Sequence, residues 1–208
     1  MATAGPNLPG TGADDASVGT KTWSTPGAIT ANDNTVAICP GATGAAPQTA
    51  VSHYLKGTNF GFAIPAGSVI NGIAFNLEKY LRSATGLASG NIVDAEVRVI
   101  KGGTVQTAVN RADTTTVYPT GGPTSYPGAG VNYGSTSDLW GVSWAASDIN
   151  ASTFGVALSC TLNKTGGKTA KTINCSVDSM TCTITYTPGA PSVRSPSGGA
   201  AYSSPMFY

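Results

Sequence analysis

Apolar and polar residues alternate along much of this chain with a period of two, which places successive side chains on opposite faces of a β-strand. The clearest example is the segment 91–103, NIVDAEVRVIKGG. One set of alternating positions is small and apolar, namely Val93, Ala95, Val97 and Val99, and the other contains Asp94, Glu96, Arg98 and Ile100. The pattern predicts a half-buried strand that ends at a Gly-Gly turn and presents Asp94 and Glu96 to solvent.

The segment 68–84, SVINGIAFNLEKYLRSA, is long enough to be a helix, but its apolar residues favour a strand. Ile73, Phe75 and Leu77 are separated by small or polar residues, which fits a period of two better than the helical period of about 3.6. A further strong strand is predicted after the polar turn at 147–153. One face of that strand carries Phe154, Val156, Leu158, Cys160 and Leu162.

Shorter strand signals, separated by turn residues, occupy 34–39, 52–65 and 173–189, and the last ends at a Pro-Gly pair. Ser147 is a candidate N-cap for a single helical turn. About eight to ten short strands predict an all-β fold. The fold class expected is an antiparallel two-sheet sandwich, jelly-roll-like, with flexible arms at both ends.

The two ends of the chain are poor in residues that could build a core. Residues 1–20 contain almost no bulky apolar group, so their burial cannot offset the entropy lost on ordering. We therefore expect an N-terminal arm (1–20), a β-sandwich domain (21–189) and a C-terminal arm (190–208). The C-terminal arm carries candidate partner-binding side chains: Tyr202, Met206, Phe207 and Tyr208. They suit an apolar groove on a neighbour, and the competing interpretation is a disordered tail without a partner.

Charged residues make up 10% of the chain and the formal net charge is +1, whereas soluble domains usually carry about 25% charged residues. Either a Ser/Thr-rich surface keeps the chain soluble, or an assembly covers much of that surface. The small net charge gives no electrostatic basis for nucleic acid or a membrane as a partner. The start, MATAGPNLPG, lacks the basic and apolar regions of a signal peptide, so we expect assembly in a cytoplasm.

Residues that perform catalysis or hold metals are few and scattered. His53 is the single histidine, and no Gly-x-Ser-x-Gly motif accompanies it, so we expect it at the surface or beside a loop. No motif among the acidic residues indicates which two could act as a pair in acid–base chemistry. Asp14, Asp15 and Asp33 match no calcium loop of known ligand order. We expect no enzyme, no catalytic residue, no metal and no cofactor.

The four cysteines are Cys39, Cys160, Cys175 and Cys182, and none has zinc-like spacing. Cys160 and Cys182 lie on apolar strand faces, where a thiol behaves as a small hydrophobic group. Disulfide pairing of Cys160 with Cys175 or with Cys182 stays open.

Large and very small residues stand side by side at several points. Trp23, Trp140 and Trp144 are expected to pack in the core or at a sheet edge, with a carbohydrate platform as the alternative. Four glycines lie beside large apolar groups, where a missing side chain allows close approach: Gly61, Gly72, Gly141 and Gly155.

Five segments, in order, resemble a family of β-sandwich domains found in tailed-phage structural proteins. They are TWSTP (22–26), FGFAIPAGSVINGIAF (60–75), DAEVRVIKGG (94–103), YGSTSDLWGVSWAASDINASTFGVAL (133–158) and CSVDSMTCTITYTP (175–188). The most specific part runs from LWG (139–141) to FGV (154–156). The chain departs from the family pattern at 179–182, where SMTC interrupts the usual apolar alternation.

The resemblance implies a virion protein of a tailed bacteriophage, most simply a capsid decoration, or cement, protein. On this hypothesis the chain forms a homo-oligomer, for which a trimer is expected, and binds the major capsid protein through many repeated apolar contacts. The alternative is a tail, baseplate or head-fibre module that binds a host-surface glycan through Tyr118, Tyr126 and Tyr133. The sequence leaves copy number and position in the virion open.

Overall fold

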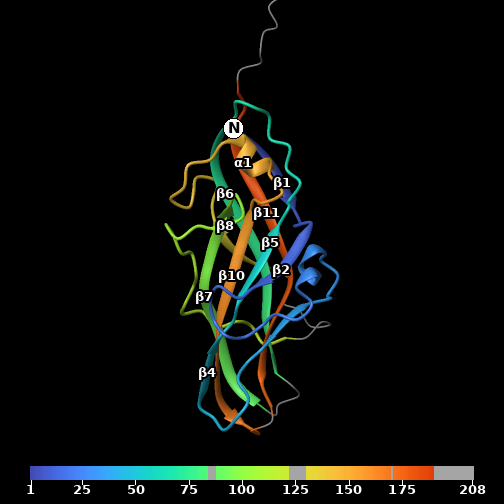
Figure 1. Ribbon diagram of the computed structural model, residues 1–208, viewed down its shortest axis with the longest axis vertical. Coiled ribbons are helices and arrows are strands. Elements are labelled where there is room, and N and C mark those ends of the chain that lie inside the picture. Colours follow the sequence, from blue (N-terminus) through green and yellow to red (C-terminus); the bar gives the residue numbers. More distant parts are fainter. Residues whose placement is uncertain (84–87, 122–129, 170, 190–208) are drawn as a thin grey trace, which may run out of the picture.

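The computed structural model describes residues 1–83, 88–121, 130–169 and 171–189 of the 208-residue chain. Within these residues, eleven strands form two antiparallel sheets packed face to face, which confirms the predicted all-β sandwich (Figure 1). The first sheet has the order β1 (Ala2–Asn7), β11 (Ile173–Thr187), β6 (Val69–Ser83) and β9 (Val131–Gly134), and β3 (Ala37–Pro40) also pairs with β11. The second has the order β2 (Thr11–Asp15), β5 (Tyr54–Thr58), β10 (Gly155–Gly167), β7 (Ala88–Lys101) and β8 (Thr104–Val105), and β4 (Gln48–Val51) also pairs with β10.

Two short helices accompany the sheets: the 3-10 helix η1 (Pro26–Thr30) and the α-helix α1 (Ala146–Asn150). The helical turn was expected to start at Ser147, and this was wrong. Ala145 precedes the turn, and its N–H donates to the Asp148 carboxylate at 2.8 Å. No helix in the described part of the chain is long and apolar enough to cross a membrane.

The long central strands follow the predicted period of two. β6 pairs with β11 along nearly its whole length, so the segment that could be mistaken for a helix is a strand. Aromatic rings from β6 and from the segments on either side of α1 meet in the core: the Phe75 ring centroid lies 5.6 Å from Trp140 and 6.2 Å from Phe154. Trp23 and Trp140 are buried, and Trp144 packs edge-on against Phe154 at 5.4 Å. The three tryptophans therefore pack as expected.

Strand β7 departs from its sequence pattern at one point. Glu96 faces Ser159 and Asp94 faces Cys160, so Ala95 has no partner and forms a β-bulge. An extra residue reverses the faces on which the following side chains lie. Val97 and Val99 point inward as predicted, but Asp94 is 1% exposed rather than solvated. The expectation that Asp94 shares a solvent-facing side with Glu96 was therefore wrong.

The first residues form strands rather than the expected N-terminal arm. β1 pairs with β11, with Ala2 opposite Tyr186, and β2 pairs with β5. These edge strands gain backbone hydrogen bonds, so they need few apolar side chains of their own. The sandwich accordingly begins at Ala2 and not near residue 21. The C-terminal arm (190–208) lies outside the described residues.

Close approach at glycine is seen at three of the four predicted positions. A Cβ built on Gly72 would lie 2.2 Å from the carbonyl carbon of Thr136, and one on Gly155 would lie 2.1 Å from the carbonyl oxygen of Gly57. Gly141 is also crowded, by a side chain at 2.9 Å. Gly61 has open space around it and is needed for its φ of +67° instead.

Candidate functional site

The most unusual chemical feature of the core is a buried ionic cluster between the two sheets. Lys79 of β6 and Asp94 of β7 form an ion pair, and their side chains are 4% and 0% exposed. The Asp94 carboxylate also accepts hydrogen bonds from the hydroxyls of Tyr118 (2.5 Å) and Tyr133 (2.6 Å) and from the N–H of Asp113 (3.0 Å). The ammonium group of Lys79 lies 4.1 Å from the centroid of the Tyr118 ring.

The electrostatics of this cluster favour a fixed network. Burial lowers the pKa of Lys79, and the negative charge of Asp94 opposes that shift. Burial raises the pKa values of Tyr118 and Tyr133, so both hydroxyls remain protonated and act as donors. Each charge therefore has partners, as buried charges require.

Access to the cluster is limited. The adjoining cavity has a volume of about 60 Å³, enough for a few water molecules. It is lined by Lys79, Asp113, Thr116, Val117, Tyr118, Pro119, Val131 and Tyr133. This arrangement can hold the two sheets together, but it leaves no room for a substrate beside the lysine.

The same cluster bears on the aromatic platform considered for glycan binding. Tyr118 and Tyr133 are each 4% exposed, and their hydroxyls are bound to Asp94. Two of the three tyrosines are thus core residues, and a platform formed by them is excluded. Tyr126 lies outside the described residues.

His53 lies in the connection just before β5, as one of the two expectations had it, but its side chain is partly buried and contacts an acid. Its Nδ1 is 2.9 Å from Oδ2 of Asp14, and the other oxygen of Asp14 accepts the N–H of Trp23 at 2.8 Å. The backbone carbonyl of His53 accepts the indole N–H of Trp23 at 2.9 Å. The contacts fasten the segment between β2 and η1 to the start of β5. The Ser52 hydroxyl donates to the backbone carbonyl of His53 at 2.8 Å, but among the described residues no serine or cysteine side chain is hydrogen-bonded to the imidazole ring. A nucleophile for a catalytic triad is therefore not in place there.

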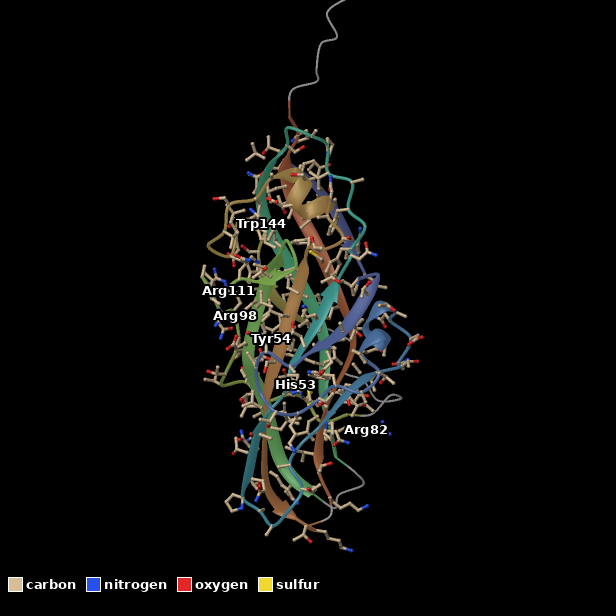
Figure 2. All side chains as sticks on the ribbon, viewed as in Figure 1. His53, Tyr54, Arg82, Arg98, Arg111 and Trp144 are labelled. Atoms are coloured by element: carbon tan, nitrogen blue, oxygen red, sulfur yellow. The ribbon has the colours of Figure 1, made fainter. Side chains whose placement is uncertain are left out.

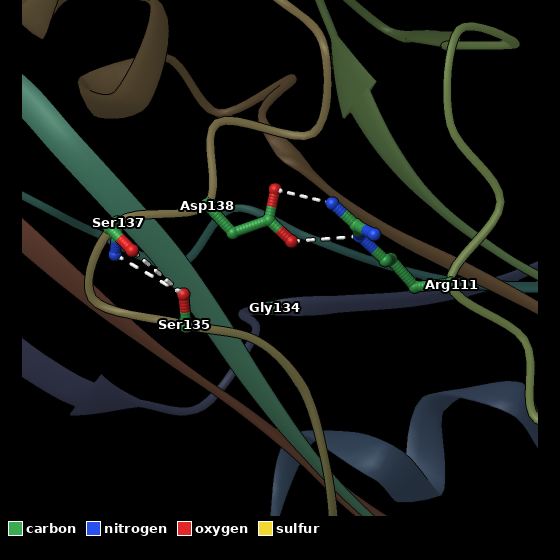
Figure 3. Close-up of a pocket in the computed structure, with 5 residues that line it drawn as sticks. All are labelled: Arg111, Gly134, Ser135, Ser137 and Asp138. Carbon is green, nitrogen blue, oxygen red and sulfur yellow. Dashed lines mark hydrogen bonds and ion pairs between the residues drawn. The ribbon is translucent and has the colours of Figure 1, made fainter.

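A hollow of about 450 Å³ on the described part of the chain is open and polar (Figure 3). Arg111 and Asp138 span it with two contacts, Nε to Oδ2 at 2.8 Å and Nη2 to Oδ1 at 2.9 Å. Asp138 also accepts the N–H of Trp140 at 2.8 Å. Because both charged groups already satisfy each other, the hollow offers a ligand little beyond Ser135 and Ser137.

The thiols are arranged so that one of the two proposed disulfides is ruled out. Cys160 and Cys175 lie within hydrogen-bonding reach of each other, and Cys39 faces Cys175 in the β3–β11 pair. Cys182 is seven positions further along β11, or about 23 Å for an extended strand. It cannot reach Cys160. All four thiols are free and buried, and burial raises the pKa of Cys175 and Cys182, which makes them unreactive.

The remaining charged groups are spread out and mostly paired. The described residues form six ion pairs, and Figure 2 shows Arg98 and Arg111 side by side at one edge of the molecule, with His53 farther along it. No group of three or more His, Cys, Asp or Glu side chains within the described ranges is placed to hold a metal ion. Besides the buried cluster, the sequence pattern did not predict that Lys164 binds backbone carbonyl groups. Its ammonium group donates to the carbonyl oxygen of Gly44 at 2.8 Å.

The beginning and the end of the described sandwich, β1 and the last residues of β11, lie at the same end of the molecule. Ala2 faces Tyr186, and Val69 faces Thr187 on the opposite side of β11. Met1 and Val69 are 91% and 62% exposed, the highest values among the large apolar residues described. We call this end, defined by Met1, Val69, Tyr186 and Thr187, the terminal pole; it is marked by N in Figure 1. The predicted partner-binding residues, Tyr202, Met206, Phe207 and Tyr208, follow it in sequence and lie outside the described residues.

Comparison with protein-family models, with curated proteins and with solved structures found no match for this chain. The basis for a functional proposal is therefore the chain's own residues.

Proposed function

We propose that this chain is a structural protein of a tailed-phage particle, most simply a decoration protein that stabilises the head by contacts between subunits. The observation that carries the proposal is the terminal pole of an elongated, tightly filled sandwich (Figure 1). It presents exposed apolar side chains beside the end of β11, which the predicted C-terminal arm follows in sequence. A body of this kind is suited to being held by one end against a larger assembly.

The distribution of charge supports the same proposal. Several described acids are paired with cations within the chain, for example Asp15 with Lys56 at 2.9 Å and Asp148 with Lys101 at 3.0 Å. Few charges are left to keep copies apart, and neighbouring subunits can pack without burying unpaired ions. Weak contacts of this type gain strength when they are repeated over a symmetric shell.

The proposal predicts which surface binds the particle. Deleting residues 190–208, or replacing Val69 with Asp, is expected to lower occupancy on purified particles that are stripped of this chain and then incubated with it. Val117→Asp is the matched control, because Val117 is also exposed (52%). It lies away from the terminal pole, since Pro119, two residues on, is hydrogen-bonded to Leu81 at the other end of β6 from Val69. Occupancy is measured by quantitative mass spectrometry against the major capsid protein. Unchanged occupancy in both pole variants would refute attachment through this end.

Copy number and a glycan array separate the proposal from its alternative. A decoration protein is present in a fixed ratio to the capsid subunits and binds no sugar on the array. A tail or fibre module is present in a few copies and binds at least one glycan. Cryo-electron microscopy of intact particles would place the chain directly.

A further inference from the structure

A group of carboxylates on the outer side of the first sheet has no positive partner among the described residues. Asp178 lies at the register shift between Val177 and Ser179 of β11, and Ser179 faces Glu78 of β6. The Asp178 side chain is in hydrogen-bonding contact with the Glu78 carboxyl group, and it accepts the N–H of Asn34. Asp178 is 1% exposed, yet its Oδ1 has no hydrogen-bond donor among the described residues.

The charges that face Asp178 are predominantly negative. Glu78 lies on the neighbouring strand, and Asp33 lies on the loop that covers this part of the sheet; both repel its negative charge. Tyr80 and Arg82 follow on the same face of β6. None of the six ion pairs involves Asp33, Glu78 or Asp178. Burial, reinforced by Glu78, raises the pKa of Asp178 to about 6.

A comparison with Asp94 shows which partners Asp178 lacks. Asp94 is equally buried, but it is surrounded by an ammonium group, two hydroxyls and an N–H. Asp178 at neutral pH has one N–H and a second carboxylate. A buried carboxylate in this position is neutralised either by a proton or by an electropositive ligand, and at pH above the pKa of Asp178 the ligand is favoured.

The ligand must be small and must favour oxygen donors. Two carboxylates in contact are typical of hard divalent cations, and Ca²⁺ completes its six to eight ligands with amide oxygens and water. The side-chain amide nitrogen of Asn32 is 3.1 Å from Glu78 Oε1. If the amide group flips, its oxygen takes the place of the nitrogen and can coordinate a cation. Residues 32–34 are exposed, which leaves a path for the ion and room for water ligands.

We propose that Asp178 and Glu78, together with the side chain of Asn32, bind a divalent cation of the Ca²⁺ class. The ion would tie the loop at 32–34 to the β6–β11 pair. The site differs from the arrangement excluded above because it uses two carboxylates and neutral oxygen donors rather than three acidic ligands.

The test is thermal unfolding of the full chain at pH 7.5 in EDTA and then in CaCl₂. At a Ca²⁺ concentration about 100 times the dissociation constant, linkage predicts a rise in midpoint of about 5–10 °C for a chain of this size. Asp178→Asn and Glu78→Gln are expected to abolish the rise. Asp113→Asn is the matched control, because Asp113 also lacks an ion pair within the described residues but lies elsewhere, and it should keep the rise.

Two outcomes would overturn the proposal. If CaCl₂ leaves the midpoint unchanged while Asp178→Asn raises it, the two carboxyl groups share a proton and no ion binds. If the rise persists in both Asp178→Asn and Glu78→Gln, the cation binds at another place. MgCl₂ at the same concentration should give a smaller rise, because Mg²⁺ demands a stricter octahedral geometry.

Discussion

Breaking the Lys79–Asp94 pair should cost far more than removing any surface ion pair of this protein. Both side chains are almost fully buried, and loss of one partner leaves a charge without compensation in the core. Such a change costs about 3–5 kcal/mol, whereas an exposed pair contributes about 0–1 kcal/mol. Against a typical total stability of about 5–15 kcal/mol, a single substitution here would remove a large part of the folding free energy.

The two single variants should differ in a defined order. Lys79→Met keeps the length of the side chain, and Asp94 retains its bonds from Tyr118, Tyr133 and Asp113. We expect this variant to lose about 3 kcal/mol. Asp94→Leu leaves an ammonium group and two hydroxyls without their acceptor, so we expect a loss of about 4–5 kcal/mol.

The double variant Lys79→Met with Asp94→Leu removes both charges and should be more stable than the sum of the single losses implies, by at least about 2 kcal/mol. The assay is urea unfolding followed by fluorescence and circular dichroism, with Lys56→Met as a control for a partly exposed pair. Single losses below about 1 kcal/mol, or strictly additive losses, would refute the assignment of a buried, coupled pair.

Three further predictions use other parts of the molecule. In EDTA, raising the pH from 4 to 7 should lower the free energy of unfolding by up to about 3 kcal/mol, because Asp178 has a pKa of about 6 in the folded state and 3.8 in the unfolded chain. Unfolding measured across this pH range should show a smaller dependence on pH in Asp178→Asn. Lys164→Met should cost about 2–3 kcal/mol in urea unfolding, because the backbone carbonyl groups bound by its ammonium are left unsatisfied, and a loss under 0.5 kcal/mol would contradict this role. Gly72→Ala should prevent stable folding, since its Cβ would meet backbone at 2.2 Å, while Gly61→Ala should cost only about 1–2 kcal/mol for its positive φ; soluble expression and thermal midpoints compare the two.

The sequence was sufficient for the fold class because the period of two is a local property. Ile73, Phe75 and Leu77 point to one face wherever the strand is placed, and the buried set on β10 follows the same rule. The turn residues at Pro65–Gly67 and at Gly102–Gly103 also act locally. The long central strands and the main core were therefore predictable before any contact between distant residues was known.

Only the tertiary structure decided where Asp94 and the first strands lie. The bulge at Ala95 arises from pairing with β10, more than 60 residues away, and it turns an apparently solvated acid into the centre of the core. Residues 2–15 are ordered by backbone hydrogen bonds to β11 and β5, which leave no signature in side-chain pattern. The meeting of Asp178 and Glu78 likewise depends on the β6–β11 register. Side-chain periodicity records which face a residue prefers, but strand register and bulges depend on the partner strand, and these determine which charged groups meet.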